Sequence, residues 1–227
     1  MNGIGDYKLT KVIVKLLNFT CLLAFVSMLF MSPNIALAQK SPRLFGTGEI
    51  QSKKLTKFKK WTSVLDRYAT EVQSELNKCT LTASNKCLVT KWRIFLKKIA
   101  DKPPREQMEL VNQYMNKWLY VIDPVNYQRK DYWATPKQFL NRNGDCEDYA
   151  IAKFASLAHL GFDKDQMRIV VLQDLNLKVP HAVLVVYVDG QALILDNQIS
   201  KVVNADRIKH YKPIFSINED AWWLHRG

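Results

Sequence analysis

The sequence lacks internal repeats and low-complexity linkers, so neither a repeat protein nor a string of linked domains is expected. No composition shift marks a boundary after the N-terminal segment. Residues 39–227 are therefore predicted to form one domain, which is long enough to bury a hydrophobic core of its own.

The sequence also lacks the alternation of basic and aromatic residues that stacks nucleic-acid bases. It carries 33 Lys and Arg residues against 21 Asp and Glu residues, a formal net charge of +12, but the lysines are scattered along predicted helices. We interpret most of this charge as a solvated basic face, with an acidic protein as the second choice of partner. Nucleic acid is not expected as a partner.

The apolar run near the N-terminus, Leu16–Phe30, is too short and too often interrupted by polar residues to span a bilayer, which needs roughly 20 apolar residues. Lysines precede the run, and Ala36-Leu37-Ala38 before Gln39 fits the small-residue cleavage rule. Residues 1–38 are therefore predicted to be a cleaved signal peptide, and residues 39–227 to be an exported mature domain.

Cysteine is scarce: the chain has four, of which Cys21 lies in the predicted signal peptide. Cys79 and Cys87 are separated by a short polar segment and are predicted to form a local disulfide in an oxidising compartment. Cys146 is then left without a partner. An unpaired cysteine in an exported protein indicates a reactive thiol.

Helical spacing of apolar residues dominates the first half of the predicted mature chain. It covers Thr56–Asn77, Leu88–Ile99 and a third segment that begins at Pro103-Pro104. Before these helices, Ser41–Gln51 has no apolar period and is predicted to be an extended arm.

Two further helices are predicted around a tight turn. Thr135 followed by Pro136 and Gln138 is typical of a capped helix start. This short helix is predicted to end with Gly144 in the left-handed conformation of a C-cap. The chain then enters the next helix at Asp145.

Segments rich in β-branched residues follow after residue 161. The predicted strands are Arg168–Leu172, Ala182–Val188, Ala192–Leu195 and Pro213–Ile217. Asp189-Gly190 predicts a two-residue hairpin turn, and the last strand is expected at an edge because it begins with proline. Helices first and strands later predict an α+β fold, with N-terminal helices packed on an antiparallel β-sheet.

The stretch from Asn143 to Ala150 places one thiol among three carboxylates at the predicted start of a helix. A helix N-terminus lowers the pKa of a thiol such as that of Cys146. The charges of Asp145, Glu147 and Asp148 act in the opposite direction. A nucleophile in this setting needs a cation close by: a histidine, a metal ion or both.

Histidine is also scarce, with four residues in the chain, and His181 stands out because it begins the strongest predicted strand. With a two-residue turn at Asp189-Gly190, the hairpin pairs Val183 with Asp196. Asp196 then shares a strand face with His181, close enough for a carboxylate to reach an imidazole. Each residue alone has an ordinary structural explanation, but together they fit a base and its orienter.

Four motifs carry a resemblance to a known family. They are Trp133-Ala134-Thr135-Pro136, Gly144-Asp145-Cys146-Glu147-Asp148-Tyr149-Ala150, Pro180-His181-Ala182-Val183-Leu184 and Leu195-Asp196-Asn197. These motifs resemble the bacterial transglutaminase-like cysteine peptidases, and among them the LapG type of periplasmic adhesin protease. The resemblance implies a papain/transglutaminase-like cysteine peptidase fold.

The resemblance also implies roles for individual residues. Cys146 would be the catalytic nucleophile, His181 the general base and acid, and Asp196 the orienter. Asp145 and Glu147 match calcium-binding positions, and Asp148 is a further candidate. Calcium takes six or more oxygen ligands. Asp66 is a guess for one ligand outside this run.

The function implied by the resemblance is a calcium-dependent endopeptidase of the periplasm. It would cut the N-terminal region of a large RTX-type adhesin at a paired-alanine site and release the adhesin from the cell surface, which promotes biofilm dispersal. An inner-membrane cyclic-di-GMP receptor would sequester the protease. Two alternatives remain open from the residues: acyl transfer to an amine by the same triad, and a non-catalytic binding module stabilised by calcium.

Overall fold

The computed structural model describes residues 42–74 and 87–227, all of which belong to one unit of the chain, Lys40–Gly227. The predicted signal peptide, residues 1–38, and Cys79 lie outside the described residues. Cys87 is disulfide-bonded, and its predicted pairing with Cys79 stays a prediction. In the described part of the chain, no helix combines the length and the apolar character needed to cross a membrane.

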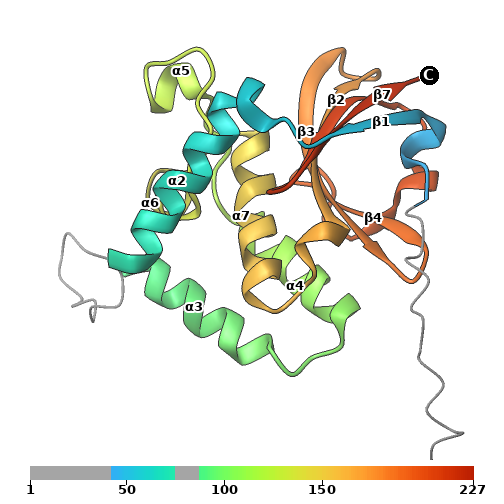
Figure 1. Ribbon diagram of the computed structural model, residues 1–227. Helices are drawn as coiled ribbons and strands as arrows, with labels where there is room; N and C mark the ends of the chain where they lie inside the picture. The colour runs from blue at the N-terminus through green and yellow to red at the C-terminus, as the bar shows by residue number, and fades with distance from the viewer. Residues whose placement is uncertain (1–41, 75–86) are drawn as a thin grey trace, which may run out of the picture. The chain divides into compact units, whose positions relative to one another are not determined.

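Helices lie on one side of a single β-sheet (Figure 1). Helices α3, Leu88–Ile99, and α4, Pro104–Met115, begin where the sequence predicts them. Helix α2, Lys59–Ser74, begins later than the predicted helix because a 3-10 turn, η2 at Leu55–Lys57, precedes it. The predicted end of this helix at Asn77 lies outside the described residues. A one-turn helix, α5 at Asp123–Asn126, lies in a region without a predicted helix.

Helix α6, Pro136–Arg142, begins with the predicted capping box. The Gln138 backbone N–H donates to Thr135 Oγ1 at 3.3 Å, and the Thr135 N–H donates to Gln138 Oε1 at 3.0 Å. Two backbone N–H groups at the helix start, which have no acceptor within the helix, thereby find side-chain acceptors within four residues.

The turn between α6 and α7, Cys146–His159, differs from the prediction. The residue with positive φ is Asn143, with φ 65° and ψ −167°, rather than Gly144. Asn143 is held there by hydrogen bonds from Leu119 N to its Oδ1 at 3.1 Å and from Asn126 Nδ2 to its carbonyl at 3.2 Å. Gly144 is required for space, because a Cβ atom there would lie 2.7 Å from Asp148 Cβ.

Seven strands form one antiparallel sheet in the order β1-β7-β6-β2-β3-β4-β5. Their bounds are β1 Gly48–Ser52, β2 Met167–Asp174, β3 Val179–Val188, β4 Gln191–Leu195, β5 Val203–Asn204, β6 Tyr211–Ile217 and β7 Trp222–Arg226. The predicted α+β class is confirmed. The hairpin register is confirmed as well, since Val188 pairs with Gln191 and Leu184 pairs with Leu195.

The expected edge position of Pro213–Ile217 is wrong, because β6 lies between β7 and β2. Proline is tolerated there because the register between β2 and β6 shifts between Val171 and Leu172, next to Pro213. At such a bulge the ladder is interrupted and a missing N–H costs little. The predicted N-terminal arm forms the edge strand β1, and β7 was not predicted.

Helix α7 is the central element between the other helices and the sheet (Figure 1). Its residues from Asp148 to Leu157 are all buried. Each large apolar side chain buried there contributes roughly 1.5–3 kcal/mol to folding. Cys146, the first residue of this helix, is therefore attached to a rigid element.

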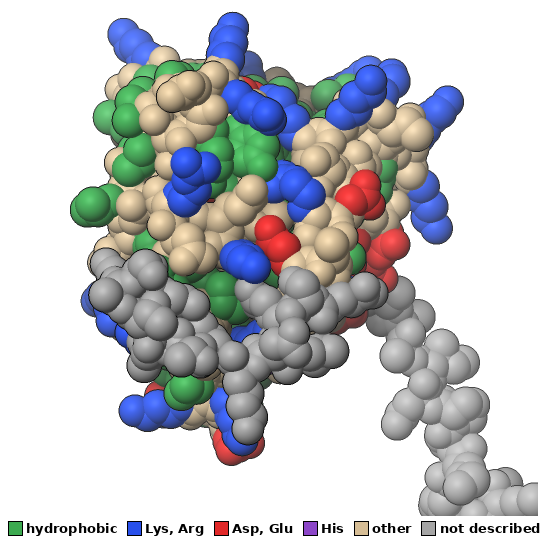
Figure 2. Space-filling model, turned by 90° about the vertical axis from the view of Figure 1, so that its left-hand side faces the viewer, with side chains coloured by type: hydrophobic (Ala, Val, Ile, Leu, Met, Phe, Trp, Pro, Cys, Tyr) green, Lys and Arg blue, Asp and Glu red, His purple; other side chains and the backbone are tan. Residues whose placement is uncertain are grey.

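On the face drawn in Figure 2, Lys and Arg side chains are spread among hydrophobic and other side chains rather than gathered in a stripe. This distribution agrees with the predicted solvated basic face.

Candidate active site

Cys146 is the first residue of α7 and is a free, half-buried cysteine. Asp148, two residues later, ties this helix start to the preceding segment by accepting from Ala134 N at 2.7 Å and from Asp145 N at 3.4 Å. The thiol of Cys146 donates to Glu147 Oε2 at 3.1 Å. The nucleophile candidate is therefore held at a helix N-terminus among carboxylates, as the sequence predicts.

The surroundings of the Cys146 thiol oppose its ionisation. Burial raises its pKa, and the charges of Glu147 and Asp145 raise it further. A hydrogen bond from the Ala182 backbone acts in the opposite direction. The helix N-terminus alone does not produce a thiolate here. The Ala182 contact also places the thiol against the start of β3, beside His181.

His181 and Asp196 are in direct contact inside the protein. His181 Nε2 lies 2.9 Å from Asp196 Oδ1, and the two side chains are almost fully buried. An Nε2–H that donates to the carboxylate leaves the lone pair of the neutral ring on Nδ1. Among the described residues, no hydrogen bond joins His181 directly to Cys146. The thiol is hydrogen-bonded instead to the backbone of Ala182, the residue that follows His181.

Asp196 accepts three hydrogen bonds in a buried position. Besides His181, the Gln198 N–H donates to Oδ1 at 2.9 Å and the Tyr211 hydroxyl donates to Oδ2 at 2.6 Å. Burial by itself raises the pKa of Asp196, but the hydrogen bond and charge of His181 and the other two donors outweigh it. The pKa of Asp196 is lowered, and the carboxylate is ionised.

The sequence analysis did not identify Tyr211. In addition to its hydrogen bond to Asp196, its ring contacts the His181 ring edge-on, with 5.7 Å between centroids. Tyr211 begins β6, which is separated from β4 by β2 and β3. Only the strand order brings this hydroxyl to Asp196, so no local motif could have indicated it.

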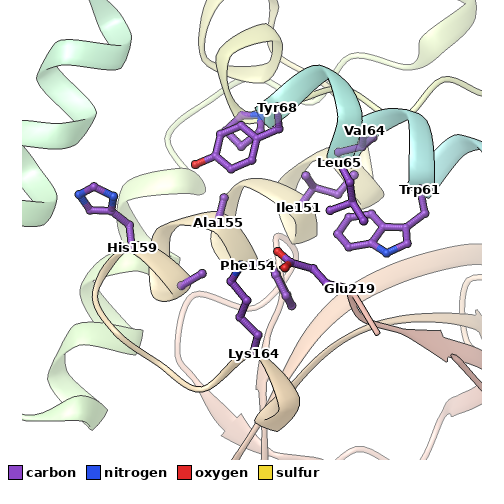
Figure 3. Close-up of a pocket in the computed structure, with 12 residues that line it drawn as sticks. Trp61, Val64, Leu65, Tyr68, Ile151, Phe154, Ala155, His159, Lys164 and Glu219 are labelled. Carbon is purple, nitrogen blue, oxygen red and sulfur yellow. Dashed lines mark hydrogen bonds and ion pairs between the residues drawn. The ribbon is translucent and has the colours of Figure 1, made fainter. Parts of the chain in front are cut away.

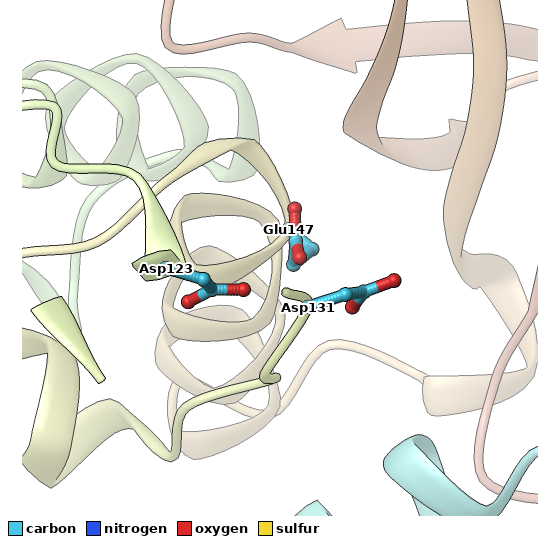
Figure 4. A group of neighbouring side chains, drawn as sticks. All are labelled: Asp123, Asp131 and Glu147. Carbon is cyan, nitrogen blue, oxygen red and sulfur yellow. The ribbon is translucent and has the colours of Figure 1, made fainter. Parts of the chain in front are cut away.

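Two groups of carboxylates beside Cys146 could each hold a metal ion. Asp123, Asp145 and Asp148 form one group, and Asp123, Asp131 and Glu147 form the other (Figure 4). Within each group the candidate ligand atoms lie within 4.8 Å of one another. The three predicted ligands are therefore brought together with Asp123 and Asp131, which the sequence analysis missed.

Asp66, the remaining guess for a ligand, is exposed on α2 and belongs to neither group. The sequence indicated a ligand role for Asp123 and Asp131 only weakly, because both lie in the segment between α4 and α6. That segment has no helical or strand period, and only the fold shows that it passes the start of α7.

The donor set of these carboxylates fits calcium. Within the described chain, Asp123 Oδ1 and Asp145 Oδ1 are buried without a hydrogen-bond partner. Burial raises the pKa of Asp145 to about 8, and the charge of Glu147 contributes in the same direction. Burial also raises the pKa values of Asp148 and Glu147. Such a group ionises together only with a cation, and hard dications prefer carboxylate oxygens.

Lys153 is a buried amine on the helix that begins with Cys146. Its side chain is fully buried, and its Nζ has no hydrogen-bond partner in the described chain. The amine lies over the Tyr149 ring, 5.7 Å from the ring centroid. Burial lowers the pKa of Lys153 to about 7, while the charge of Asp196 acts in the opposite direction.

Lys153→Met is expected to stabilise the protein at pH 7, because methionine fills a similar space without burying an amine. The pKa of Lys153 is about 7 in the folded chain and 10.5 in its ordinary state. Between these values the unfolded chain binds a proton that the folded chain lacks, so the stability of the unsubstituted protein falls as the pH falls. Urea unfolding should show a gain of roughly 2–4 kcal/mol at pH 7.

The same substitution should have a much smaller effect at pH 10, where most of the lysine penalty is absent. Lys97→Met, at an exposed position on α3, is the control and should change stability by less than about 0.5 kcal/mol at either pH. An equal gain for Lys153→Met at both pH values would contradict the assignment of a neutral buried amine.

A surface pocket of about 250 Å³ lies between α2 and α7 (Figure 3). Its lining includes Tyr68 of α2 and Phe154 and His159 of α7, and none of the triad candidates. Trp61 also lines it but is almost fully buried, with its Nε1 donating to Asn218 O at 2.7 Å. Trp61 is therefore part of the hydrophobic core.

Comparisons with known proteins agree with this arrangement. Residues 70–224 match the family described as bacterial transglutaminase-like cysteine proteinase BTLCP. A structure of Legionella pneumophila LapG matches with a TM-score of 0.58 and 32% identity, covering 70% of this chain and 87% of that chain. A comparison with curated proteins found no match.

Two further structures of the Legionella protein are similar to this chain to the same extent. One is calcium-bound and the other EGTA-treated, each with a TM-score of 0.58 and 32% identity over 70% of this chain, and they are covered over 87% and 84% of their lengths. The family match spans most of the described residues, including Cys146, His181 and Asp196. The chain therefore belongs to the bacterial transglutaminase-like cysteine proteinases.

Proposed function

We propose that this cysteine proteinase is a calcium-dependent endopeptidase of the LapG type, with Cys146, His181 and Asp196 as its catalytic triad. One observation carries the proposal. The Cys146 thiol at the start of α7 lies against Ala182, next to a histidine whose Nε2 is 2.9 Å from a buried, ionised carboxylate. The candidate nucleophile therefore lies next to the candidate base and its orienter, although the three come from different segments of the chain.

In this mechanism His181 Nδ1 takes the proton of Cys146, and the thiolate attacks the carbonyl carbon of the scissile bond. The Cys146 backbone N–H at the helix start donates to the developing oxyanion, and the Trp133 indole N–H is the candidate second donor. His181 then gives its proton to the leaving amine. Water, deprotonated by His181, releases the acyl group, while Asp196 stays ionised and stabilises the imidazolium.

Calcium would be held by Asp123, Asp145 and Asp148, or by Asp123, Asp131 and Glu147. When bound, it would supply positive charge that offsets the carboxylates around the thiol. In the chain itself, Glu147 accepts a hydrogen bond from the Cys146 thiol. A thiol that donates to Glu147 does not donate to His181, so the carboxylate of Glu147 competes with the base.

The substrate, compartment and partner are part of the same proposal. The substrate is the N-terminal region of a large RTX-type adhesin, cut at a paired-alanine site, and the compartment is the periplasm, reached by removal of residues 1–38. An inner-membrane cyclic-di-GMP receptor sequesters the protease. Similarity to Legionella pneumophila LapG at 32% identity supports this assignment.

The direct test incubates residues 39–227 with the N-terminal fragment of an RTX-type adhesin, with calcium and with EGTA, and follows the products by mass spectrometry. Two fragments that together gain one water are expected with calcium only. If no cleavage occurs in either condition, the protease proposal fails. Cleavage that is indifferent to EGTA removes the calcium dependence alone.

Acyl transfer is the second candidate function, because the same triad forms the same acyl-enzyme. Adding a primary amine to the reaction separates the two, since transfer links the amine to the acyl fragment and hydrolysis does not. A non-catalytic binding module is the third. In that case an alkylating probe would modify Cys146 no faster than a free thiol.

Tyr211→Phe is expected to lower kcat about tenfold with little change in KM, because Asp196 loses one of its three donors. The Tyr211 hydrogen bond lowers the pKa of Asp196. Its removal should therefore move the acid limb of the pH–rate profile to higher pH. Tyr187→Phe is the matched control, since that hydroxyl is buried on β3 without a hydrogen-bond partner in the described chain. Equal profiles for the two variants would contradict the role of Tyr211 as a positioning residue.

A further inference from the structure

Exposed large hydrophobic side chains are concentrated in two short segments of the described chain. Of ten such side chains, seven lie in residues 119–125 and 175–179, and they are 43% to 71% exposed. They are Leu119, Tyr120, Ile122 and Val125, which we name the first apolar border, and Leu175, Leu177 and Val179, the second apolar border. Scattered exposed hydrophobics are ordinary, but contiguous ones mark interaction sites.

The first apolar border adjoins the loop that carries the thiol. Tyr120 forms a parallel β-bridge with Gly144, two residues before Cys146. Val121 N donates to Gly144 O at 2.9 Å, and Leu119 N donates to Asn143 Oδ1 at 3.1 Å.

The second apolar border is the tip of the hairpin between β2 and β3, which leads directly into His181. Asn176 N and Leu177 N donate to Asp174 Oδ1 at 2.8 and 3.0 Å, and Leu175 N donates to His210 O at 2.8 Å. In Figure 1 this hairpin and α5 lie at the same end of the molecule as the start of α7.

Both borders combine a fixed backbone with outward apolar side chains. The hydrogen bonds above hold the two segments in place, so little conformational freedom remains to be lost when a partner binds. The first apolar border bridges Gly144, two residues before Cys146, and the second leads along β3 into His181. Apolar side chains next to a few polar groups are typical of a binding site.

We infer that the two apolar borders bind the apolar side chains of an extended substrate peptide on either side of the bond that Cys146 attacks. The inference rests on the proposed function and adds a substrate preference to it. Apolar residues are favoured a few positions from the scissile bond, where they reach the borders. Acidic residues next to the bond are disfavoured, because they would meet the carboxylates around the thiol.

The test uses quenched-fluorescence peptides with a central alanine pair, flanked either by leucines or by serines. Three forms of residues 39–227 are compared with the unsubstituted protein: Leu119→Ser with Val125→Ser, Leu175→Ser with Leu177→Ser, and Ile94→Ser. Ile94 on α3 is 63% exposed and lies in neither border, which makes it the matched control.

Each double substitution is expected to lower kcat/KM for the leucine-flanked peptide about tenfold, mainly through KM, since uniform binding is lost. For the serine-flanked peptide the same substitutions should change kcat/KM less than about twofold, and Ile94→Ser should leave both values unaltered. Alkylation of Cys146 by iodoacetamide, followed in parallel, shows that each variant is folded with its thiol intact.

Two results would overturn the inference while leaving the proposed function in place. One is cleavage of the leucine-flanked peptide by both double variants as efficiently as by the unsubstituted protein. The other is a dimer of the unsubstituted protein that the double substitutions dissociate without a change in KM, which would make the borders a contact between copies of this chain.

Failure of the proposed function gives a different pattern, in which the unsubstituted protein cleaves neither the adhesin fragment nor any peptide. Fluorescence anisotropy with the leucine-flanked peptide and the Cys146→Ala form then decides the inference alone. If the peptide binds and the double substitutions weaken this binding, the borders are supported as a peptide site. If the peptide does not bind, the inference is overturned.

Discussion

Replacing Cys146 by alanine is expected to lower cleavage of the adhesin fragment by roughly 10⁴-fold or more. No other cysteine of the described chain is free to act as nucleophile. If the proposed triad works as a unit, removing the attacking atom costs about as much as removing all of its members. Single-turnover cleavage, quantified by mass spectrometry, measures the loss.

The fold should tolerate this substitution, which makes the result interpretable. The Cys146 side chain is half-buried, and the hydrogen-bond acceptor of its thiol is the neighbouring Glu147. Removing it also removes a group whose ionisation the surroundings oppose. The melting temperature should therefore stay within a few degrees. Cys146→Ser keeps the shape and should lose nearly as much activity, and cleavage that survives either substitution contradicts a thiol mechanism.

Asp123→Asn is expected to weaken calcium binding at least about tenfold, because Asp123 belongs to both carboxylate groups. Its Oδ1 is buried without a partner in the described chain, and its Oδ2 accepts from Tyr132 N. Isothermal titration calorimetry measures the affinity. The thermal shift is the second readout, since an ion at 100 times its Kd stabilises a protein by about 2.7 kcal/mol.

The stability change of Asp123→Asn should reverse its sign with calcium. Burial raises the pKa of Asp123, so the neutral amide removes a penalty when EGTA is present. Without calcium the variant should be at least as stable as the unsubstituted protein, and with calcium it should be less stable. A loss of equal size in both conditions would mean that Asp123 is only structural.

Asp131→Asn is the companion variant that separates the two carboxylate groups. Asp131 is exposed and forms an ion pair with Lys60, so its substitution should cost little stability. If Asp123, Asp145 and Asp148 hold the ion, calcium affinity is retained in Asp131→Asn. If the affinity falls as far as in Asp123→Asn, the ligands are Asp123, Asp131 and Glu147.

Local features were predictable because their hydrogen bonds close within a few residues. The capping box of Thr135 and Gln138 needs only four residues to form. The Asp189-Gly190 turn sets the hairpin register, and that register brings Asp196 to His181. The candidate pair of base and orienter therefore followed from turn chemistry and from counting along two strands.

Errors arose where a residue's role depends on strands that are distant in the sequence. Proline at the start of β6 indicated an edge, but β7 pairs on one side and a bulge beside Leu172 accommodates the ring on the other. Tyr211 reaches Asp196 only across β2 and β3. Asp123 joins the acidic group only because its segment packs against the turn before α7.

The sequence by itself determined the local frame of this protein: a thiol at a helix start, a histidine at a strand start, and the hairpin that presents Asp196. Such features depend on backbone hydrogen bonds between near neighbours, which residue types dictate directly. Only the tertiary structure decided that Asp123 and Asp131 join the carboxylates near Cys146, that Tyr211 donates to Asp196 and that Lys153 is buried. These placements depend on which surfaces pack together, because burial and long-range pairing are properties of the whole sheet and its helices.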